Sequence, residues 1–209
     1  RSGPFFAASD FIEATISGKG GHAAKPHETI DPTVIASQIV VALQTIASRR
    51  VDPVEQVVVS ITSFETSSTA FNVIPQEVKI KGTVRTLDPD VRDLAEKEFL
   101  RITELTAEAM GGSADAKFTR GYPVMSNSSE QTEFAAKVAR DVAGECAEAP
   151  LVMGGEDFAY MLEERPGAYI LLGNGNSSPV HHPKYNFNDD AIPFGCSWLV
   201  ELVEQKMPA

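Results

Sequence analysis

The sequence contains few of the residues from which disulfide scaffolds and nucleic-acid interfaces are built. Its 209 residues include two cysteines and four histidines, and 18 Lys and Arg stand against 29 Asp and Glu, a formal net charge of −11. Cys146 and Cys196 are far apart and in no CxxC pattern, so we expect free thiols in a cytoplasmic protein. An acidic chain without a basic cluster repels a phosphate backbone, which argues against nucleic acid as a partner.

Long apolar runs and metal-binding spacings are missing as well. The longest apolar run, around residues 35–43, is interrupted by Ser37 and Gln38 and is too short to span a bilayer, so we expect no membrane association. The spacings HxD, HxxH and HExxH do not occur. Since a hydrolytic zinc or manganese site needs about three protein ligands per metal, the sequence by itself predicts no complete site of that kind.

The first 120 residues alternate between strand and helix patterns. Two-residue alternation predicts strands at residues 11–17, 57–65, 77–87 and 114–120. Helical spacing predicts two helices, which begin at the Asp-Pro pairs of residues 31–32 and 88–89. The order strand, helix, strand, strand, helix, strand predicts a mixed α/β (α+β) fold of the ferredoxin-like βαββαβ type, with an antiparallel sheet covered by helices on one face.

The pattern changes after residue 121. It predicts a short helix after Gly154-Gly155, longer helices at residues 129–143 and 194–205, and an apolar strand at residues 168–172. One strand among helices does not make an independent sheet, so this segment reads as a piece of a larger layer. The sequence therefore divides into a domain at residues 10–121 and a second segment at residues 122–209.

Three short patterns could carry chemistry. His22 lies in a loop of glycines and alanines that leaves its imidazole open to a ligand, although the spacing suits a solvated histidine equally well. His181 and His182 are adjacent, and in an extended segment neighbouring side chains point opposite ways, so only one could readily reach a given metal. Glu156 and Asp157 are either carboxylates that line a pocket or acidic residues at a helix N-terminus, which the helix dipole favours.

Five segments together resemble the peptidase M20 family, most closely its amidohydrolase branch of hippurate hydrolases, N-acyl-amino-acid amidohydrolases and hydrolases of indoleacetyl amino acids. They are residues 18–24 (GKGGHAA), 71–75 (FNVIP), 82–86 (GTVRT), 155–158 (GEDF) and 181–183 (HHP). Each segment is short. Together, five such segments in the family's order, spread over essentially the whole chain, make the resemblance to the family specific.

The resemblance implies an α/β metallopeptidase-like catalytic domain with two divalent metal ions, zinc or manganese, interrupted by a ferredoxin-like lid that forms a homodimer. It places residues 10–121 in the lid and residues 122–209 in the C-terminal part of the catalytic domain, whose N-terminal half is absent. It implies that His22 is catalytic, reaching across the dimer into the partner's active site to help polarise the scissile carbonyl. His181 matches the last metal ligand of the family.

The resemblance also implies that four residues bind substrate. Asn72 and Arg85 match lid residues that contact the substrate, with the arginine pairing with its carboxylate. Alternation in the strand at residues 77–87 points Arg85 away from the core, which suits a guanidinium that binds a carboxylate through two hydrogen bonds. Glu156 and Asp157 match a pocket loop near the metals.

Two main functional hypotheses follow. The first is a fragment of a metal-dependent amidohydrolase that cleaves the amide bond of N-acyl amino acids or similar small substrates through a metal-activated water; the fragment alone would be inactive, because other metal ligands and the general base lie outside it. The alternative is a non-catalytic dimerisation or binding module. A stand-alone ferredoxin-like regulatory domain is a third reading, which leaves the GEDF and HHP segments unexplained.

Overall fold

The computed structural model describes residues 1–207, which form a mixed α/β fold of two compact units. The unit that we call the sheet unit comprises Phe6–Met125 and Val152–Tyr160. The other, the helix unit, comprises Arg1–Phe5, Ser126–Leu151 and the residues from Met161 onward.

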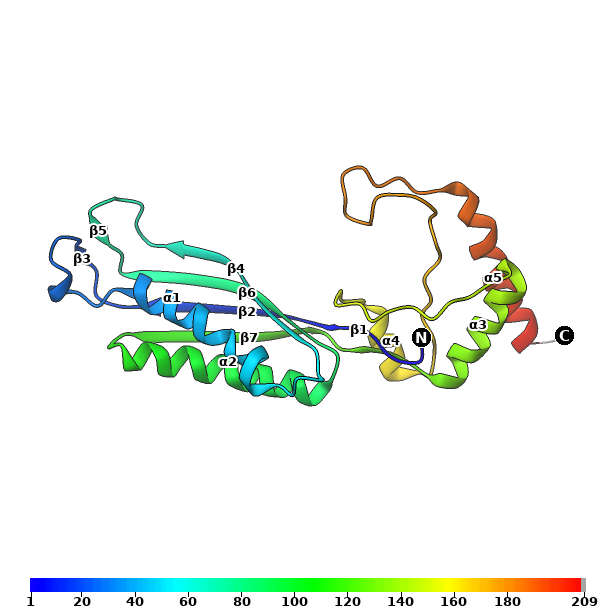
Figure 1. The fold of residues 1–209 in the computed structure, drawn as a ribbon, viewed down its shortest axis with the longest axis horizontal. Helices are drawn as coiled ribbons and strands as arrows, with labels where there is room; N and C mark the ends of the chain where they lie inside the picture. Colours follow the sequence, from blue (N-terminus) through cyan, green and yellow to red (C-terminus); the bar gives the residue numbers. More distant parts are fainter. Residues whose placement is uncertain (208–209) are drawn as a thin grey trace. The chain divides into compact units, whose positions relative to one another are not determined.

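The sheet unit is built on a four-stranded antiparallel sheet in the order β4-β6-β2-β7 (Figure 1). Its strands are β2 (Ala8–Ser17), β4 (Val57–Thr66), β6 (Glu77–Thr86) and β7 (Ser113–Tyr122). The central pair, β2 and β6, is in register over ten residues, from Ala8 opposite Thr86 to Ser17 opposite Glu77. All four strands expected from the alternating pattern are confirmed.

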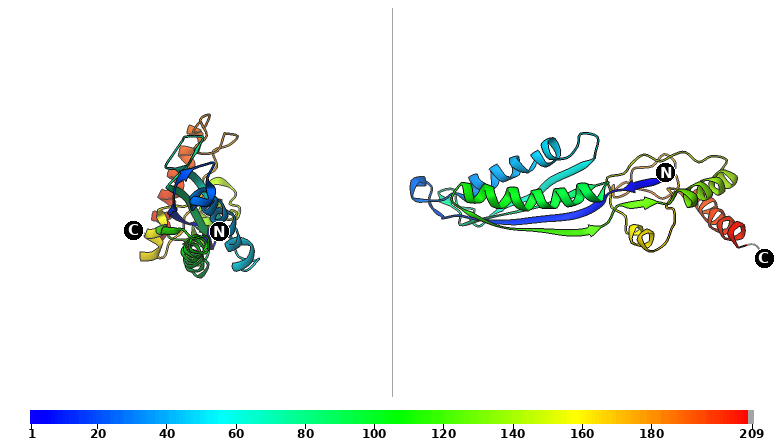
Figure 2. Two further views of the ribbon diagram at one scale, coloured as in Figure 1. Left: turned by 90° about the vertical axis from the view of Figure 1, so that its left-hand side faces the viewer. Right: turned by 90° about the horizontal axis from the view of Figure 1, so that it is seen from below.

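One face of the sheet is covered by two helices, α1 (Pro32–Leu43) and α2 (Pro89–Ala109). They lie side by side along the sheet (Figures 1 and 2). The predicted Asp-Pro starts are confirmed, because Asp31 accepts a hydrogen bond from the amide of Thr33 and Asp88 accepts one from the amide of Asp90, each at 2.8 Å. A π-helical turn, η2 (Ile46–Arg50), follows α1.

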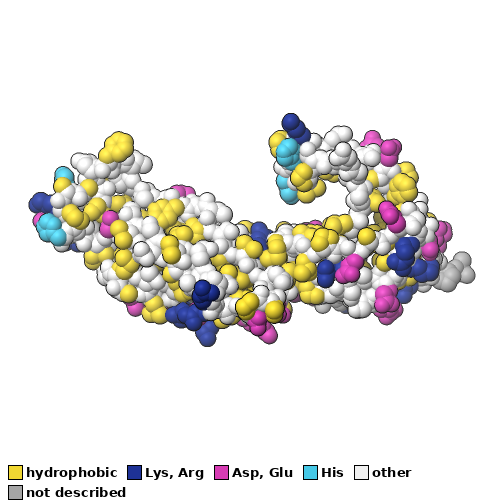
Figure 3. Space-filling model, viewed as in Figure 1, with side chains coloured by type: hydrophobic (Ala, Val, Ile, Leu, Met, Phe, Trp, Pro, Cys, Tyr) yellow, Lys and Arg dark blue, Asp and Glu magenta, His cyan; other side chains and the backbone are white. Residues whose placement is uncertain are grey.

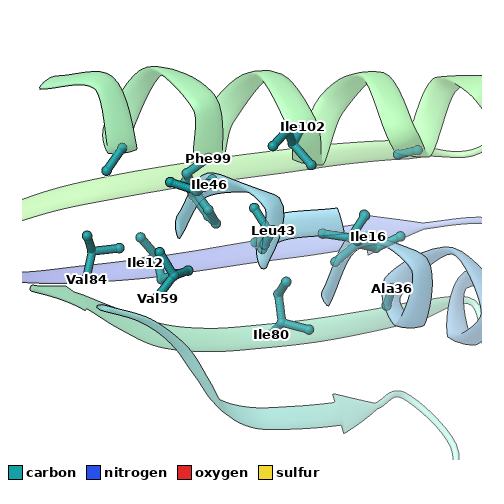
Figure 4. Close-up of a cluster of buried hydrophobic side chains, with 14 of the residues drawn as sticks. Ile12, Ile16, Ala36, Leu43, Ile46, Val59, Ile80, Val84, Phe99 and Ile102 are labelled. Carbon is teal, nitrogen blue, oxygen red and sulfur yellow. The ribbon is translucent and has the colours of Figure 1, made fainter. Parts of the chain in front are cut away.

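The core of the sheet unit lies between the helices and the sheet (Figure 4). Both helices, the turn η2 and the two central strands contribute aliphatic and aromatic side chains that are almost wholly excluded from solvent, among them Ile12, Ile16, Leu43, Ile46, Ile80, Val84 and Phe99. Burial of each such side chain is worth roughly 1.5–3 kcal/mol. This core leaves the opposite face of the sheet open.

The helix unit contains α3 (Ser129–Ala143) and α5 (Ile192–Lys206), which pack together, with the indole of Trp198 donating to the carbonyl oxygen of Ala135 at 3.1 Å. The short strands β1 (Gly3–Phe6) and β8 (Met125–Asn127) form a two-stranded sheet, and α4 (Phe158–Glu164) follows the loop that begins at Val152. None of the helices formed by residues 1–207 combines the length and apolar character that a bilayer crossing needs.

The strand expected at residues 168–172 is absent, which corrects that prediction. A strand requires a backbone ladder with a neighbour. Here the side chain of Asn127 takes the place of a neighbouring strand: its amide group donates to the carbonyl oxygen of Tyr169 (2.9 Å), and its oxygen accepts from the amide of Tyr169 (2.8 Å). The segment is apolar enough for a strand, but no ladder forms along it within residues 1–207.

A buried ion pair joins three elements at one end of the sheet. Asp10 on β2 is fully buried, and its carboxylate accepts two hydrogen bonds from the guanidinium of Arg92 on α2, one of them from Nε at 2.9 Å. Asp10 also accepts from the amide of Gly121, and Arg92 donates to the carbonyl oxygen of Gly121, at 3.0 and 3.1 Å. The pair therefore fixes the start of β2 and of α2 to the end of β7.

We expect Arg92→Met to lower the free energy of unfolding by about 3–5 kcal/mol, because it leaves the carboxylate of Asp10 buried without its charge partner. Urea denaturation followed by circular dichroism measures this change. The control is Lys97→Met on the same helix, which removes an exposed positive charge and is expected to change stability by less than about 1 kcal/mol. Equal losses in the two variants would contradict this account of the pair.

A second charged cluster centres on Glu98 of α2, which is only 8% exposed. Its carboxylate accepts from Nε of Arg101 at 3.1 Å and lies 3.3 Å from Nε of Arg50. The hydrogen bond from Arg101 is the main cause that lowers the pKa of Glu98 below its ordinary value of 4.5, with the nearby positive charges adding to it and burial opposing it. The same hydrogen bond raises the pKa of Arg101.

A lowered pKa in the folded state means that ionised Glu98 stabilises the fold above about pH 4.5, and that this contribution is lost as the pH falls through the folded-state pKa. We therefore expect the stability difference between the wild type and Glu98→Gln to be largest near neutral pH and to shrink below pH 4.5. Denaturation from pH 7 to pH 3 tests this, with the exposed Glu104→Gln on the same helix as control. A difference that did not change with pH would refute the linkage.

Candidate substrate and metal-binding residues

His22 and Asn72 lie together at one end of the sheet unit. Two short strands, β3 (Gly21–His22) and β5 (Val73–Ile74), pair there with His22 opposite Val73, and the amide of Ala23 donates to the carbonyl oxygen of Asn72 at 3.0 Å. Both side chains are exposed. Figure 3 shows histidine side chains on the surface at this end, which we call the tip.

The local hydrogen bonding of His22 leaves Nε2 as a hydrogen-bond donor on an exposed side chain. Its Nδ1 accepts from the amide of Ala24 at 3.1 Å, and an accepting Nδ1 places the proton of a neutral imidazole on Nε2. The glycines before it permit this loop: a side chain at Gly20 would meet the carbonyl oxygen of Ile74 at 2.8 Å. The tip can therefore present an N–H group and an amide side chain to a ligand.

Arg85 lies at the opposite end of β6, in a row with Ser9 and Tyr122 on three adjacent strands. Its neighbours on β6, Val84 and Thr86, are fully buried, so Arg85 is on the open face, as its alternation predicted. Nη1 of Arg85 donates to Oγ of Ser9. Within residues 1–207, no carboxylate forms an ion pair with this guanidinium, which leaves its charge available to an anionic ligand.

The loop that carries Glu156 and Asp157 lies at the same end, which we call the base. The amide of Ala7 bonds the carbonyl oxygens of Val152 and Gly154, both at 3.0 Å, and this fastens the loop to the start of β2. Glu156 accepts from the amide of Phe158 at 3.4 Å, the contact expected of an acidic residue at a helix N-terminus, while Asp157 is exposed. The loop therefore brings two carboxylates to the region of Arg85.

The tip and the base are far apart. Glu77, where β6 begins, and Arg85 are eight residue steps apart along the strand, which at roughly 3.4 Å per step amounts to about 27 Å. The loops of the tip connect to the Glu77 end, where the amide of Gly18 donates to the carbonyl oxygen of Gln76 at 3.1 Å. The structure thus brings His22 to Asn72 and Arg85 to the loop of Glu156, but it does not bring the two groups together.

His181, in the helix unit, lies in a tight turn rather than in the extended segment that we expected. The amide of His182 donates to the carbonyl oxygen of Pro179 at 3.1 Å, and His181 has a φ of 67°, in the left-handed region. A non-glycine residue in this region costs about 1 kcal/mol or more and is more frequent at functional sites. His182 Nδ1 accepts from the amide of Lys184 at 3.1 Å, and both imidazoles are exposed.

Asn174 closes the loop that carries these histidines, a role that the motifs did not reveal. Its side-chain oxygen accepts from the amide of Asn188 at 2.7 Å, and its amide group donates to the carbonyl oxygen of Asn186 and to Oγ of Ser177, both at 2.8 Å. The bonds to Asn186 and Asn188 join the two ends of a segment that begins at Asn174 and ends at η3 (Asp189–Ala191). The repeated asparagines on both sides of the histidines were the available signal.

Residues 1–207 do not make a metal site by themselves. No three of their His, Cys, Asp and Glu side chains gather into a group that could hold a metal ion. His181 therefore has too few companions here for the coordination that a hydrolytic metal needs. Cys146 and Cys196 are both free.

We expect Asn174→Ala to loosen the His181 loop without unfolding the helix unit, because it removes the two bonds that join the ends of the loop and the bond to Ser177. Amide hydrogen exchange at residues 176–187 should accelerate about tenfold or more, as loss of roughly 1 kcal/mol per bond implies. The matched control is Asn176→Ala, an exposed asparagine of the same loop, which should leave exchange unchanged. Equal exchange in the wild type and Asn174→Ala would show that the loop is closed by other means.

A family model described as Peptidase family M20/M25/M40 matches residues 30–205. The chain is 38% identical over 205 residues to N-acetyl-L-cysteine deacetylase of Bacillus subtilis, covering 98% of this chain and 49% of that protein. It is 36% identical over 208 residues to hippurate hydrolase of Campylobacter jejuni, covering 97% of this chain and 53% of that protein.

Among solved structures, the chain is similar to the Bacillus subtilis YXEP protein, described as a dinuclear metal-binding peptidase from the M20 family. The TM-score is 0.80 with 29% sequence identity, over 97% of this chain and 51% of that one. The chain spans about half the length of the proteins that it matches.

Proposed function

Because the chain belongs to peptidase family M20/M25/M40, we propose that it is the C-terminal half of a metal-dependent amidohydrolase that cleaves the amide bond of N-acyl amino acids or similar small substrates. The proposal rests mainly on the setting of Arg85. This arginine lies on the open face of the sheet, beside the loop of Glu156 and Asp157, and has no carboxylate partner within residues 1–207. A guanidinium in that setting suits the carboxylate of an N-acyl amino acid. Two related proteins carry the names deacetylase and hippurate hydrolase.

We assign residues 10–121 to a ferredoxin-like lid domain and residues 122–209 to the C-terminal part of an α/β catalytic domain. The sheet order β4-β6-β2-β7, with both helices on one face, supports the first assignment. In support of the second, the helix unit exposes many apolar side chains, including Leu171, Leu172, Phe194, Leu199 and Val203. Such a surface suits burial against further polypeptide of the catalytic domain.

The proposed enzyme acts as a homodimer formed through the lid. Within one sheet unit, His22 and Asn72 lie in loops at the Glu77 end of β6, about 27 Å along the strand from Arg85, too far for all three to touch one small substrate. Strand β4 offers a route to pairing, since it lies at the edge of the sheet with β6 as its neighbour there and exposes Val58 and Phe64 by 37% and 43%. In a dimer, His22 and Asn72 at the tip of one chain would complete the active site at the base of the other.

The chemistry assigned to this chain is binding and polarisation. Arg85 binds the substrate carboxylate, and Asn72 and the loop of Glu156 and Asp157 orient the substrate. His22 donates from Nε2 to the carbonyl oxygen as negative charge develops there, which is where such a donor stabilises the transition state most.

Two metal ions, zinc or manganese, would supply the Lewis acidity for hydrolysis, with His181 as one ligand. Because residues 1–207 lack a complete metal group, we propose that the chain alone is inactive. The two free thiols suit a cytoplasmic location.

A second candidate is a non-catalytic dimerisation or binding module, which the edge strand β4 with its exposed Val58 and Phe64 would also suit. The experiment that separates the two is hydrolysis of N-acetyl and N-benzoyl amino acids with added manganese or zinc. It compares this chain with a version extended upstream to its natural start. The amidohydrolase proposal expects activity in the extended protein alone, whereas inactivity of a folded, metal-loaded extended protein would favour the binding module.

In the extended protein, Arg85→Met should lower kcat/KM for N-acyl amino acids by about 10- to 100-fold, the effect of removing a charged hydrogen-bond partner of the substrate. The corresponding N-acyl amino-acid amides, which lack the carboxylate, should be hydrolysed at unchanged rates. Lys81→Met removes an exposed positive charge from the same strand and serves as control. Equal losses for acid and amide substrates would show that Arg85 does not bind the substrate carboxylate.

Dimerisation through β4 predicts that Phe64→Glu shifts the protein from dimer to monomer in analytical ultracentrifugation, because a charge on an edge strand opposes edge-to-edge pairing. The matched control is Phe11→Glu, which places the same charge on the open face of the interior strand β2, where the phenylalanine is 58% exposed. If Phe64→Glu stayed dimeric, the interface would lie elsewhere.

A further inference from the structure

Ser9 is the residue at which the sheet and the loop of Glu156 meet. It lies on the open face of β2 between Arg85 and Tyr122, yet it is only 6% exposed. Its Oγ accepts a hydrogen bond from Nη1 of Arg85, and its Cβ faces the backbone of Gly155. Ser9 therefore contacts both parts of the proposed carboxylate site.

The contact between the loop and the sheet has no room for a side chain. A Cβ at Gly155 would lie 2.7 Å from Cβ of Ser9, 3.1 Å from Cδ2 of Tyr122 and 3.3 Å from Nη1 of Arg85. The first of these distances is shorter than carbon atoms tolerate, and it involves a short side chain that cannot move aside. The height of the loop above Arg85 is thus set by the absence of a side chain at Gly155 and by the Cβ of Ser9.

The backbone on both sides of this contact is fixed. The buried pair of Asp10 and Arg92 follows Ser9 directly, and the loop is bonded to Ala7 before it. After the loop, in α4, the hydroxyl of Tyr160 donates to the carbonyl oxygen of Gly121 at 3.3 Å, and the ring of Tyr160 meets that of Tyr122 edge to face. Ser9 is therefore a rigid reference point for the two groups that it touches.

We propose that Ser9 is a positioning residue for carboxylate recognition: its hydroxyl fixes the guanidinium of Arg85, and its Cβ sets the position of the Glu156 loop above that guanidinium. The physical reason is that a free arginine side chain must be ordered when it binds, whereas a fixed one presents its donors in place. The assignment to a substrate carboxylate rests on the proposed function, but the positioning itself does not.

The positioning is tested first on the 209-residue protein by nuclear magnetic resonance. Ser9→Ala should accelerate exchange of the Nε proton of Arg85 by about fivefold or more, because a hydrogen bond that holds the guanidinium is lost. The control is Thr83→Ala, which removes another hydroxyl from the same face, one that donates to the carbonyl oxygen of Asp10 at 2.8 Å, and should leave the Arg85 signal unchanged. An unchanged Arg85 signal in Ser9→Ala would overturn the proposal, whatever the enzyme does.

A pair of size changes tests the contact with the loop. Gly155→Ala should shift the amide signals of Glu156 and Asp157 and speed their exchange, and adding Ser9→Gly should recover most of the wild-type behaviour, because it removes the atom that the new methyl group would meet. The Arg85 signal should not recover in the double variant, since its acceptor is gone. If the double variant were as perturbed as Gly155→Ala alone, the Cβ of Ser9 would not set the position of the loop.

Kinetics of the upstream-extended protein test the link to substrate. Ser9→Ala should raise KM for N-acyl amino acids about tenfold with kcat within about twofold, and should leave KM for the corresponding amides unchanged. Equal increases for both substrates would make Ser9 a structural residue only and overturn its role in recognition. A wild-type protein inactive on both substrates would instead refute the proposed function, and the resonance experiments would still decide the positioning.

Discussion

The ten-residue ladder between β2 and β6 determines what each part of the sheet unit can reach. Its length places the loops of His22 and Asn72 at one end and Arg85 at the other, and its antiparallel register puts Ser9 directly beside Arg85. A sheet of this kind does not bend enough to bring its two ends to one small molecule. This length is the reason for the proposal that two chains share each active site. The base of a chain would belong to its own site, and the tip would belong to its partner's.

The base of the sheet combines a buried charge pair on one face with an open site on the other. Asp10 and Arg92 lie on the helix side, where they tie β2 and α2 to the end of β7, and Ser9, next to Asp10, points to the opposite side. Because successive residues of a strand alternate between faces, a structural anchor and a binding contact can occupy neighbouring positions. The ion pair of Asp10 and Arg92 thereby holds the backbone that carries Ser9, although its side chains lie on the other face of the sheet.

Local patterns predicted the four strands, both helix starts and the direction of Arg85, because alternation and Asp-Pro pairs act over a few residues. They failed where the outcome depended on distant partners. Residues 168–172 are apolar enough for a strand, but no ladder forms along them in the described chain. The turn at His181 is a local exception, since it depends on a bond from His182 back to Pro179 that the sequence pattern did not indicate. The closeness of His22 to Asn72, the role of Asn174 and the contact of Ser9 with Gly155 depend on pairings across more than ten residues, which no single motif records.

In the proposed dimer, His22 and Arg85 of one chain serve different active sites, and mixed dimers of the upstream-extended protein show whether they do. His22→Ala and Arg85→Met proteins, each nearly inactive alone, are mixed in equal amounts, exchanged and assayed. If the tip acts on the partner's site, half of the dimers are mixed and each has one intact site, so activity should recover to about a quarter of the wild-type value. If both residues act within one chain, every site in the mixture lacks one of them, and activity that stayed at the level of the single variants would show that the tip does not serve the partner's site.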